Sequence, residues 1–260
     1  MLPHRGRSSF PAAAKHRTRR PCHDVSMTTP ARLASAAALI ADPARAAMLQ
    51  ALMAGEALTA GELARSAGIA PSTASAHLAA LTDGGLVAVH AQGRHRWFRI
   101  ASEDVAAILE SLMGLAEATR PARRWPHGEA LHAARTCWDH LAGRLGVALH
   151  EGLVSRGVLR PAPGGWETTA AGDALLERLG VDLDAARRAR RFACDCMDWS
   201  ERRPHLGGGL ARAICTLYLA RGWVRRQPGE GLARRLVAPT PEGSRVLREA
   251  FGVRLDAEAA

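Results

Sequence analysis

Apolar residues recur at helical spacing through the first part of the chain and predict a series of short helices. Residues 31–41 form an alanine-rich helix in this prediction, with Leu33 and Ile40 on one face. Asp42 is a predicted helix cap, and the Pro43 that follows suits the first position of a second helix over about 43–53. A capping-box pattern at residues 59–62 predicts a third helix, which ends at Gly68.

The pattern then changes from helix to hairpin and back to helix. Pro71 opens a helix to about Thr82, whose buried side is predicted at Ala74, Leu78 and Leu81. After two glycines, residues 86–91 and 96–100 predict two strands joined through residues 92–95. A helix over about 103–118 follows, and the prolines after it mark a domain boundary. Two short helices, a glycine-containing turn and a hairpin predict a winged helix-turn-helix.

The second helix of this motif turns small polar residues outward, which suits a DNA major groove. The DNA-binding residues predicted on the helix and at the hairpin tip are Ser72, Thr73, Ser75, Ala76, His77, Arg94 and Arg96. The hydroxyls can donate to phosphates or base edges, and the arginines suit phosphates or a minor groove. Two alternatives stay open: His77 can cap or pack instead, and winged helices also serve as protein-docking modules.

This part of the sequence resembles the ArsR (arsenic-repressor) family of bacterial transcriptional regulators. The matching strings are Asp42-Pro-Ala-Arg45, Glu62-Leu-Ala64, Ser72-Thr-Ala-Ser-Ala-His-Leu-Ala-Ala-Leu81, Gly85-Leu-Val87 and Gly93-Arg-His-Arg-Trp-Phe-Arg-Ile100. They span about residues 31–118. The resemblance implies a homodimer that binds double-stranded operator DNA and represses until an effector releases it. It places the dimer interface on the helices predicted over 31–41 and 103–118.

The metal ligands that many family members carry are missing from this region. The helix that ends at Gly68 precedes the recognition helix, which is the helix from Pro71 that is expected to enter the major groove. This preceding helix has no cysteine, and residues 102–119 contain neither histidine nor cysteine. Thiolate and imidazole ligands are therefore absent from these two places, where the family members carry them. Any sensing function is expected elsewhere.

Residues 128–260 contain a degenerate internal repeat, with copies at about 128–181 and 187–253. His140 to Gly157 and His205 to Gly222 are both 17 residues apart. Each copy predicts the order helix, helix, short β-hairpin, helix. The expected fold is thus mainly α with short β-hairpins. It has a winged helix-turn-helix DNA-binding and dimerisation domain at 27–120 and a C-terminal effector or assembly domain at 128–260.

Two copies predict a pseudo-twofold domain in which equivalent residues face one another. Cys137 and His140 in the first copy correspond to Cys196 and His205 in the second. The four would form a Cys₂His₂ set suited to zinc, cadmium or lead. Several alternatives stay open: the thiols can sense oxidants, the cysteines can be plain core residues, or the effector can be organic. Asp139 and Asp198 are candidate hard ligands or helix caps, and Cys194 and Cys196 are expected on a helix, facing apart.

Composition narrows the function classes. Of 35 basic residues only Lys15 is a lysine, so no P-loop or lysine Schiff-base site is expected. No Gly-x-Ser-x-Gly, dinucleotide-binding or His-Glu-x-x-His motif occurs, and we expect no enzyme. The net charge of +10 suits a polyanionic partner.

No membrane helix is predicted and the cysteines suggest no disulfide framework, so the expected location is the cytoplasm. Residues 1–26 are predicted to be a disordered basic leader, or translation upstream of a start at Met27.

Overall fold

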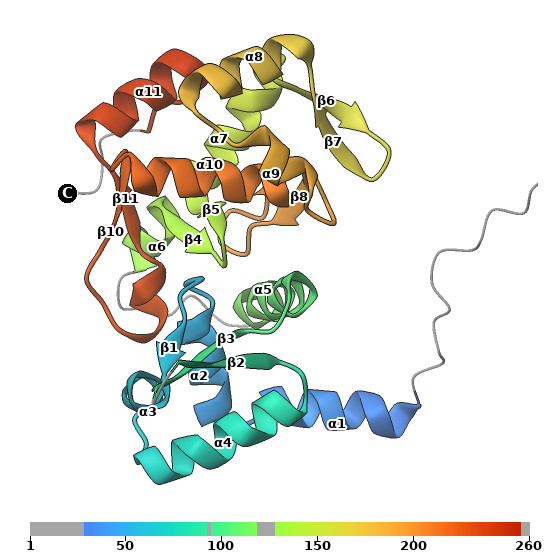
Figure 1. The fold of residues 1–260 in the computed structure, drawn as a ribbon, viewed down its shortest axis with the longest axis vertical. Helices are drawn as coiled ribbons and strands as arrows, with labels where there is room; N and C mark the ends of the chain where they lie inside the picture. The colour runs from blue at the N-terminus through green and yellow to red at the C-terminus, as the bar shows by residue number, and fades with distance from the viewer. Residues whose placement is uncertain (1–28, 93–94, 119–127, 256–260) are drawn as a thin grey trace, which may run out of the picture.

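The computed structural model describes residues 29–92, 95–118 and 128–255. The predicted leader at 1–26 and Arg94 therefore lie outside the described residues. The described chain has one group of elements before residue 119 and another after residue 127, drawn from blue to green and from green to red in Figure 1. Each group has its own main hydrophobic core.

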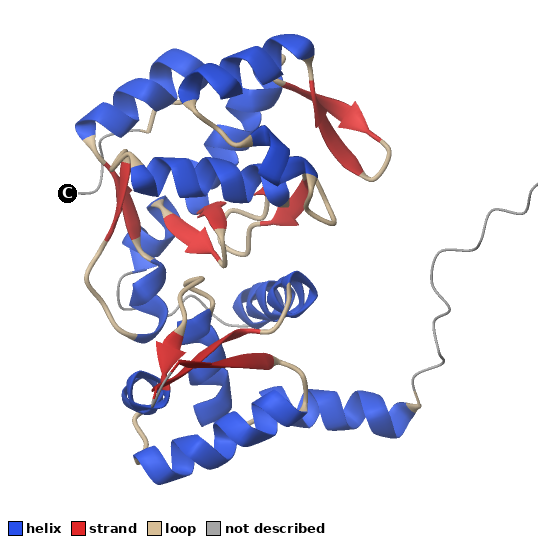
Figure 2. Cartoon of the chain, in the orientation of Figure 1, coloured by secondary structure: helices blue, strands red, loops and turns tan. Residues whose placement is uncertain are grey.

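The first group is the predicted winged helix-turn-helix. Its elements are α1 (Pro30–Ile40), α2 (Pro43–Leu52), β1 (Leu58–Thr59), α3 (Ala60–Ala67), α4 (Pro71–Asp83), β2 (Val87–Gln92), β3 (His95–Ile100) and α5 (Glu103–Ala118). The three strands form an antiparallel sheet in the order β1-β3-β2. Helix α1 extends away from the rest (Figures 1 and 2) and buries none of its residues.

Local capping explains why these helices start where the sequence predicts. The Asp42 side chain accepts the backbone N–H of Arg45 at the start of α2. At α3 the Thr59 and Glu62 side chains form both hydrogen bonds of a capping box, and Gly68 closes the helix in the left-handed conformation. The buried side of α4 is Ala74, Leu78 and Leu81, as predicted. The strands begin and end within one residue of the predicted bounds.

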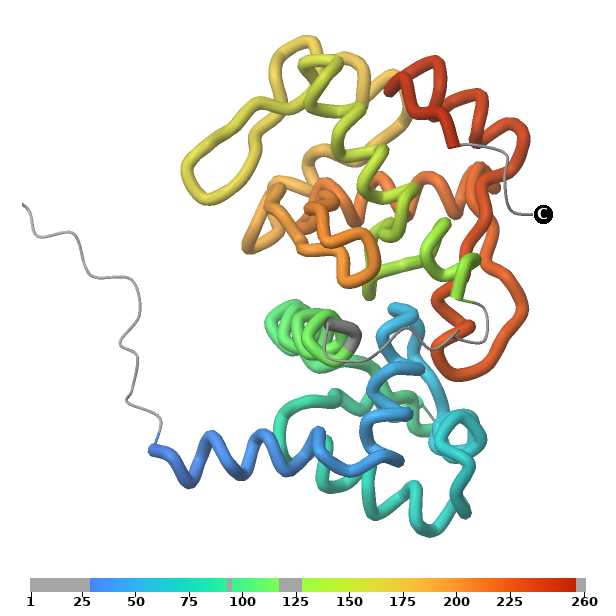
Figure 3. The backbone as a smooth tube through the Cα atoms, turned by 180° about the vertical axis from the view of Figure 1, so that it is seen from behind, coloured from blue at the N-terminus to red at the C-terminus, as the bar shows by residue number. Residues whose placement is uncertain are grey.

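The second group contains two runs of similar element order. The first run is α6 (Gly128–Ala133), β4 (Arg135–Cys137), β5 (His140–Ala142), α7 (Gly143–Ser155), β6 (Leu159–Ala162), β7 (Gly165–Thr168) and α8 (Ala170–Leu179). The second run is α9 (Leu183–Arg187), β8 (Cys194–Met197), β9 (Pro204–Gly207), α10 (Gly209–Ala220), β10 (Val224–Arg226), η1 (Gly231–Arg235), β11 (Val237–Pro239) and α11 (Pro241–Phe251). Helices α7 and α10 contribute many of the residues of the larger core. Figure 3 traces the backbone of both helices, coloured yellow-green and orange by residue number.

The predicted order of helix, helix, hairpin, helix is wrong in one respect. Each run has an additional two-stranded hairpin between its first two helices, β4–β5 and β8–β9. In β8 the side chains of Cys194 and Cys196 are half-buried, while Asp195 and Met197 are exposed. This period of two is that of a strand, so Cys194 and Cys196 lie on one face rather than apart on a helix. Three- and four-residue strands are too short to show such alternation clearly in the sequence.

Candidate functional site

The outer face of α4 presents the residues predicted to contact DNA. Ser72, Thr73, Ser75 and Ala76 are exposed, whereas Ala74 and Leu78 on the opposite face are buried. The Ser75 hydroxyl donates to the Pro71 carbonyl oxygen (3.0 Å) within the helix, so its oxygen remains an acceptor toward the outside. The helix therefore exposes small, mostly polar side chains, which allow close approach to the base edges in a major groove.

His77 is partly turned back toward α2. Its Nδ1 lies 3.3 Å from Nη1 of Arg45 and 3.9 Å from a carboxylate oxygen of Asp42. Arg45 also donates to the carbonyl oxygens of Leu39 (2.7 Å) and Ala38 (2.8 Å). These contacts place His77 in the junction of α1, α2 and α4, which is the packing alternative that the sequence left open.

The hairpin β2–β3 is the wing beside α4. Arg96 and Arg99 are both exposed on β3, and the Arg96 guanidinium lies 5.9 Å from the ring centroid of Phe98. Phe98 is buried and pairs with Leu58 of β1, which holds the strand against the core. A second cationic side chain, Arg99, thus accompanies the predicted Arg96 on the same wing.

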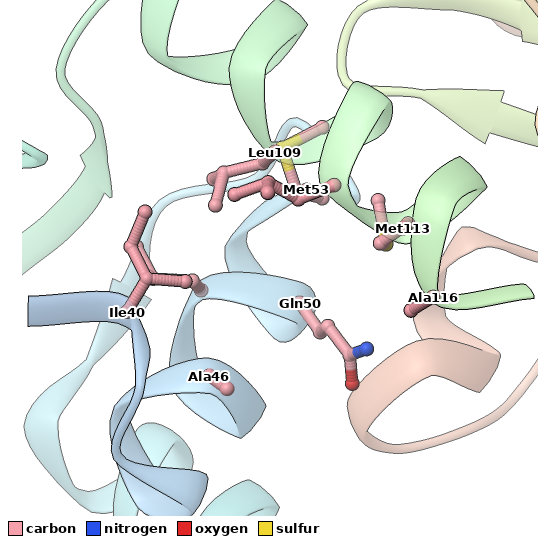
Figure 4. Close-up of a pocket in the computed structure, with 9 residues that line it drawn as sticks. Ile40, Ala46, Gln50, Met53, Leu109, Met113 and Ala116 are labelled. Carbon is pink, nitrogen blue, oxygen red and sulfur yellow. The ribbon is translucent and has the colours of Figure 1, made fainter. Parts of the chain in front are cut away.

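Helices α1 and α5 expose large apolar side chains. The large apolar side chains of α5 divide into two groups, because Leu109 is 7% exposed whereas Ile108, Leu112 and Leu115 are 55%, 40% and 61% exposed. Leu33 on α1 is 67% exposed. Beside Leu112 an apolar hollow opens between the end of α1, helix α2 and helix α5, with Met53 and Met113 in its wall (Figure 4). The two helices thus carry a large uncovered apolar surface.

The structure brings together the four predicted ligands Cys137, His140, Cys196 and His205. Cys137 is the strand partner of His140 in β4–β5, and Cys196 is the strand partner of His205 in β8–β9. The candidate ligand atoms of all four lie within 4.8 Å of one another. Cys196 is half-buried and the other three are buried. None of the four described cysteines is in a disulfide.

The spacing of these atoms matches a tetrahedral site. The two sulfurs are 3.8 Å apart and the two histidine Nε2 atoms are 3.1 Å apart. With Zn–S of about 2.3 Å and Zn–N of about 2.05 Å, a tetrahedron has S–S and N–N edges of about 3.8 and 3.3 Å. The sulfur–sulfur and nitrogen–nitrogen distances are therefore close to those that one zinc-sized ion requires.

Each histidine is oriented by the aspartate of its own copy. His140 Nδ1 lies 3.0 Å from Asp139 Oδ1, and His205 Nδ1 lies 3.2 Å from Asp198 Oδ2. A carboxylate on Nδ1 fixes the tautomer that leaves Nε2 as a ligand, and this arrangement is common around protein-bound metals. Asp139 and Asp198 are thus supports for the histidines rather than ligands in this cluster.

The protonation of the cluster is strongly perturbed by its burial. Burial raises the pKa of the Cys137 thiol well above its ordinary value, and the Cys196 side chain adds to this rise. Burial opposes the protonation of His205, but the hydrogen bond to Asp198 outweighs it and raises the histidine pKa. Since the two Nε2 atoms are 3.1 Å apart, they are placed to share one proton rather than carry one each.

Sequence reasoning missed the network behind the cluster. Burial opposes ionisation of Asp198, but His205 and Arg135 hold its pKa far below the ordinary value. Arg135 Nη2 donates to Asp198 Oδ1 (2.7 Å), and both side chains are fully buried. The same carboxylate accepts the N–H groups of Gly143, Ser200 and Glu201. The Asp-x-Ser motif at residues 198–200 is typical of a turn in which the aspartate accepts nearby backbone N–H groups. No local signal identifies Arg135 as its partner.

Comparison with known proteins supports the same interpretation of the first half. A model described as a helix-turn-helix domain matches residues 40–90. The chain is 39% identical over 199 residues to an uncharacterized HTH-type transcriptional regulator, YdfF, of Bacillus subtilis (strain 168). That match covers 75% of this chain and 88% of YdfF. Because 199 residues exceed the whole winged helix-turn-helix, the similarity extends into the second half of the chain.

Solved structures also resemble the first half. The homodimeric winged helix-turn-helix DNA-binding domain of Mb0332 from Mycobacterium bovis is 28% identical, with a TM-score of 0.35, over 42% of this chain and 100% of that one. HlyU from Vibrio cholerae is 28% identical, with a TM-score of 0.31, over 33% of this chain and 91% of its own. Among the described residues, no helix is long and apolar enough to cross a membrane.

The recognition helix, the wing and the matched helix-turn-helix region define a DNA-binding protein of the winged helix-turn-helix class. Within that class, the chain belongs to the family of HTH-type transcriptional regulators that includes YdfF, and its sequence motifs are of the ArsR type.

Proposed function

We propose that the protein binds a near-palindromic operator as a homodimer and represses transcription until an effector releases it. The exposed polar face of α4 supports base contacts, and the exposed Arg96 of the wing supports phosphate or minor-groove contacts. In a dimer the two recognition helices would lie about one DNA turn apart, roughly 34 Å. The protein would act in the cytoplasm.

The uncovered apolar face on α1 and α5 supports a second copy of this chain as the dimer partner. Its largest exposed side chains are Leu33, Ile108, Leu112 and Leu115. Burying such a face in a dimer stabilises it by about 25 cal/mol for each Å² of apolar surface that is removed from water. A twofold interface places the same surface of each copy against the other, so one apolar strip can serve both partners.

The proposed effector is a divalent thiophilic metal ion, with zinc, cadmium and lead as the candidates. The observation that carries this proposal is the convergence of Cys137, His140, Cys196 and His205 from two hairpins, with all candidate ligand atoms within 4.8 Å. Two thiolates and two imidazoles suit these ions better than magnesium or calcium. A bound cation would replace the protons that the buried cluster otherwise retains.

Metal content tests this assignment. Protein purified without chelator and then exposed to zinc should retain about one ion per chain, as measured by elemental analysis. Cys137→Ser and Cys196→Ser should each lose it. Cys194→Ser is the matched control, because Cys194 lies two residues from Cys196 on the same strand but outside the four-residue cluster. Equal metal content in all four proteins would eliminate the site.

A thiol redox sensor is the second candidate function, since the Cys137 and Cys196 sulfurs are only 3.8 Å apart. Treatment with diamide would oxidise both thiols to one disulfide while the diamide is reduced to its hydrazine. Peptide mapping by mass spectrometry detects that bond. A redox sensor would lose DNA binding on oxidation without any metal.

DNA binding itself is tested with a fluorescent fragment of the DNA upstream of the protein's own gene. Arg96→Ala should weaken binding to all sequences and lower the slope of log K against log salt by roughly 1. Substitution of Ser75 should instead relax the preference at particular base positions. An unchanged salt slope for Arg96→Ala would remove Arg96 from the interface.

A further inference from the structure

The turn of hairpin β4–β5 lies directly on the end of helix α2. Trp138 stands between the proposed ligand Cys137 and the histidine support Asp139, and its backbone N–H donates to the Met53 carbonyl oxygen (3.0 Å). Its side chain packs against the core of the DNA-binding half. The Arg212 side chain covers the other side, with its guanidinium 5.5 Å from the Trp138 ring centroid and a hydrogen bond to Asp139.

The contact between this turn and α2 leaves no room for a methyl group. Gly55, just beyond α2, has φ +79°, and a Cβ atom there would lie 2.1 Å from the Trp138 carbonyl oxygen. Real carbon and oxygen atoms do not approach so closely, and this oxygen belongs to the backbone rather than to the end of a flexible side chain. Any side chain at Gly55 would therefore force the hairpin turn away from α2.

A second connection joins the same hairpin to α5. Arg235 is fully buried, and its Nε donates to the carbonyl oxygen of Thr136, the residue before Cys137 (2.7 Å). Its Nη2 donates to Glu110 of α5, which is 4% exposed. A buried arginine that bridges two elements holds them in one relative position, because breaking the Glu110 end leaves an uncompensated charge and breaking the Thr136 end leaves a buried hydrogen-bonding group unpaired.

We infer that β4–β5 transmits the state of the Cys/His cluster to the DNA-binding half, through Trp138 to α2 and through Arg235 to α5. This inference rests on the proposed metal-responsive function. The hairpin carries two of the four proposed ligands, so a change in their positions on metal binding displaces the same backbone that contacts Met53 and Arg235. Helix α2 packs against α4, and α5 carries the exposed apolar face, so both DNA contact and dimer geometry respond.

The experiment compares DNA affinity with and without metal in the full-length wild type and its variants. Co²⁺ is the probe, because its visible absorption reports tetrahedral coordination and thiolate ligation directly. The variants are Gly55→Ala, which breaks the contact from the α2 side, and Gly157→Ala as the matched control. Gly157 has a similar left-handed backbone (φ +66°), but a Cβ there meets nothing within 4 Å. Glu110→Gln, which keeps the side-chain size and removes the charge, is a second variant should Gly55→Ala fail to fold.

Wild type and Gly157→Ala should bind Co²⁺ and change their DNA affinity by about 5–150-fold, the usual range of allosteric coupling. Gly55→Ala should show the same cobalt spectrum and still bind DNA, but its metal-dependent change in DNA affinity should be clearly smaller than that of Gly157→Ala, because only the connection through Arg235 remains. Cobalt uptake with an undiminished ratio in Gly55→Ala and Glu110→Gln would overturn this inference alone. A wild type that takes up no cobalt, or takes it up without any change in DNA affinity, would overturn the proposed metal response as well.

Discussion

Replacing Asp198 should destabilise the protein more than any exposed charge does. Its carboxylate pairs with Arg135, and both side chains have no exposed surface. It also accepts three backbone N–H groups, from Gly143 (2.7 Å), Ser200 (3.0 Å) and Glu201 (3.1 Å). In Asp198→Ala these donors lose their acceptor and the arginine charge remains buried. Removing one partner of a buried ion pair costs about 3–5 kcal/mol.

Urea denaturation followed by circular dichroism, in a chelator so that no metal contributes, measures this cost. The control is Glu167→Ala, which removes the partner of Arg160 in a pair whose side chains are 63% and 43% exposed. That change should cost no more than about 1 kcal/mol. The double variant Arg135→Met/Asp198→Asn should be less destabilised than Asp198→Ala, because no buried charge is left alone. A cost for Asp198→Ala no larger than that for Glu167→Ala would refute the reasoning.

Three further predictions concern the DNA-binding half. Thr59→Ala removes the cap of α3 and should lower the free energy of unfolding by about 0.5–2 kcal/mol, whereas Ser111→Ala, on the exposed face of α5, should change it little. The hydrogen bond from the N–H of Thr59 lowers the pKa of Glu62 in the folded state. The Glu62 carboxylate therefore stabilises the fold at pH values above its unfolded-state pKa of 4.5, and this contribution is lost as the pH falls through the lower folded-state pKa. In denaturation curves at acid pH, Glu62→Gln should make the free energy of unfolding less dependent on pH. Leu115→Glu should shift sedimentation from dimer to monomer, and an unchanged dimer would place the interface elsewhere.

The first half was predictable because its signals are local. A cap such as Asp42 or Thr59 forms its hydrogen bonds within three residues, and the buried side of α4 repeats at helical spacing. The same locality explains why the sequence left two roles open for His77. Whether it faces DNA or Asp42 depends on how α2 and α4 cross, and no spacing within α4 reveals that.

In the second half, the prediction missed one hairpin in each run, while the predicted grouping of cysteines and histidines matches the structure. The strands of β4–β5 and β8–β9 are too short for their alternation to be distinguished from a helix in the sequence. The repeat nevertheless predicted that equivalent cysteines and histidines would meet. Equivalent positions in two similar units come together around a pseudo-twofold axis whatever elements carry them.

The two runs of the second half differ in the surroundings of their aspartates, and this difference bears on which hairpin can respond to a ligand. Asp198 is fully buried and held by Arg135 and three backbone groups, so the β8–β9 side of the cluster is anchored in the second half of the chain. Asp139 is 20% exposed, and its partners are the His140 ring and the partly exposed Arg212. Fewer fixed contacts allow displacement at a lower free-energy cost. Asp139 is therefore the more easily displaced of the two histidine supports, and it lies on the hairpin that contacts the DNA-binding half.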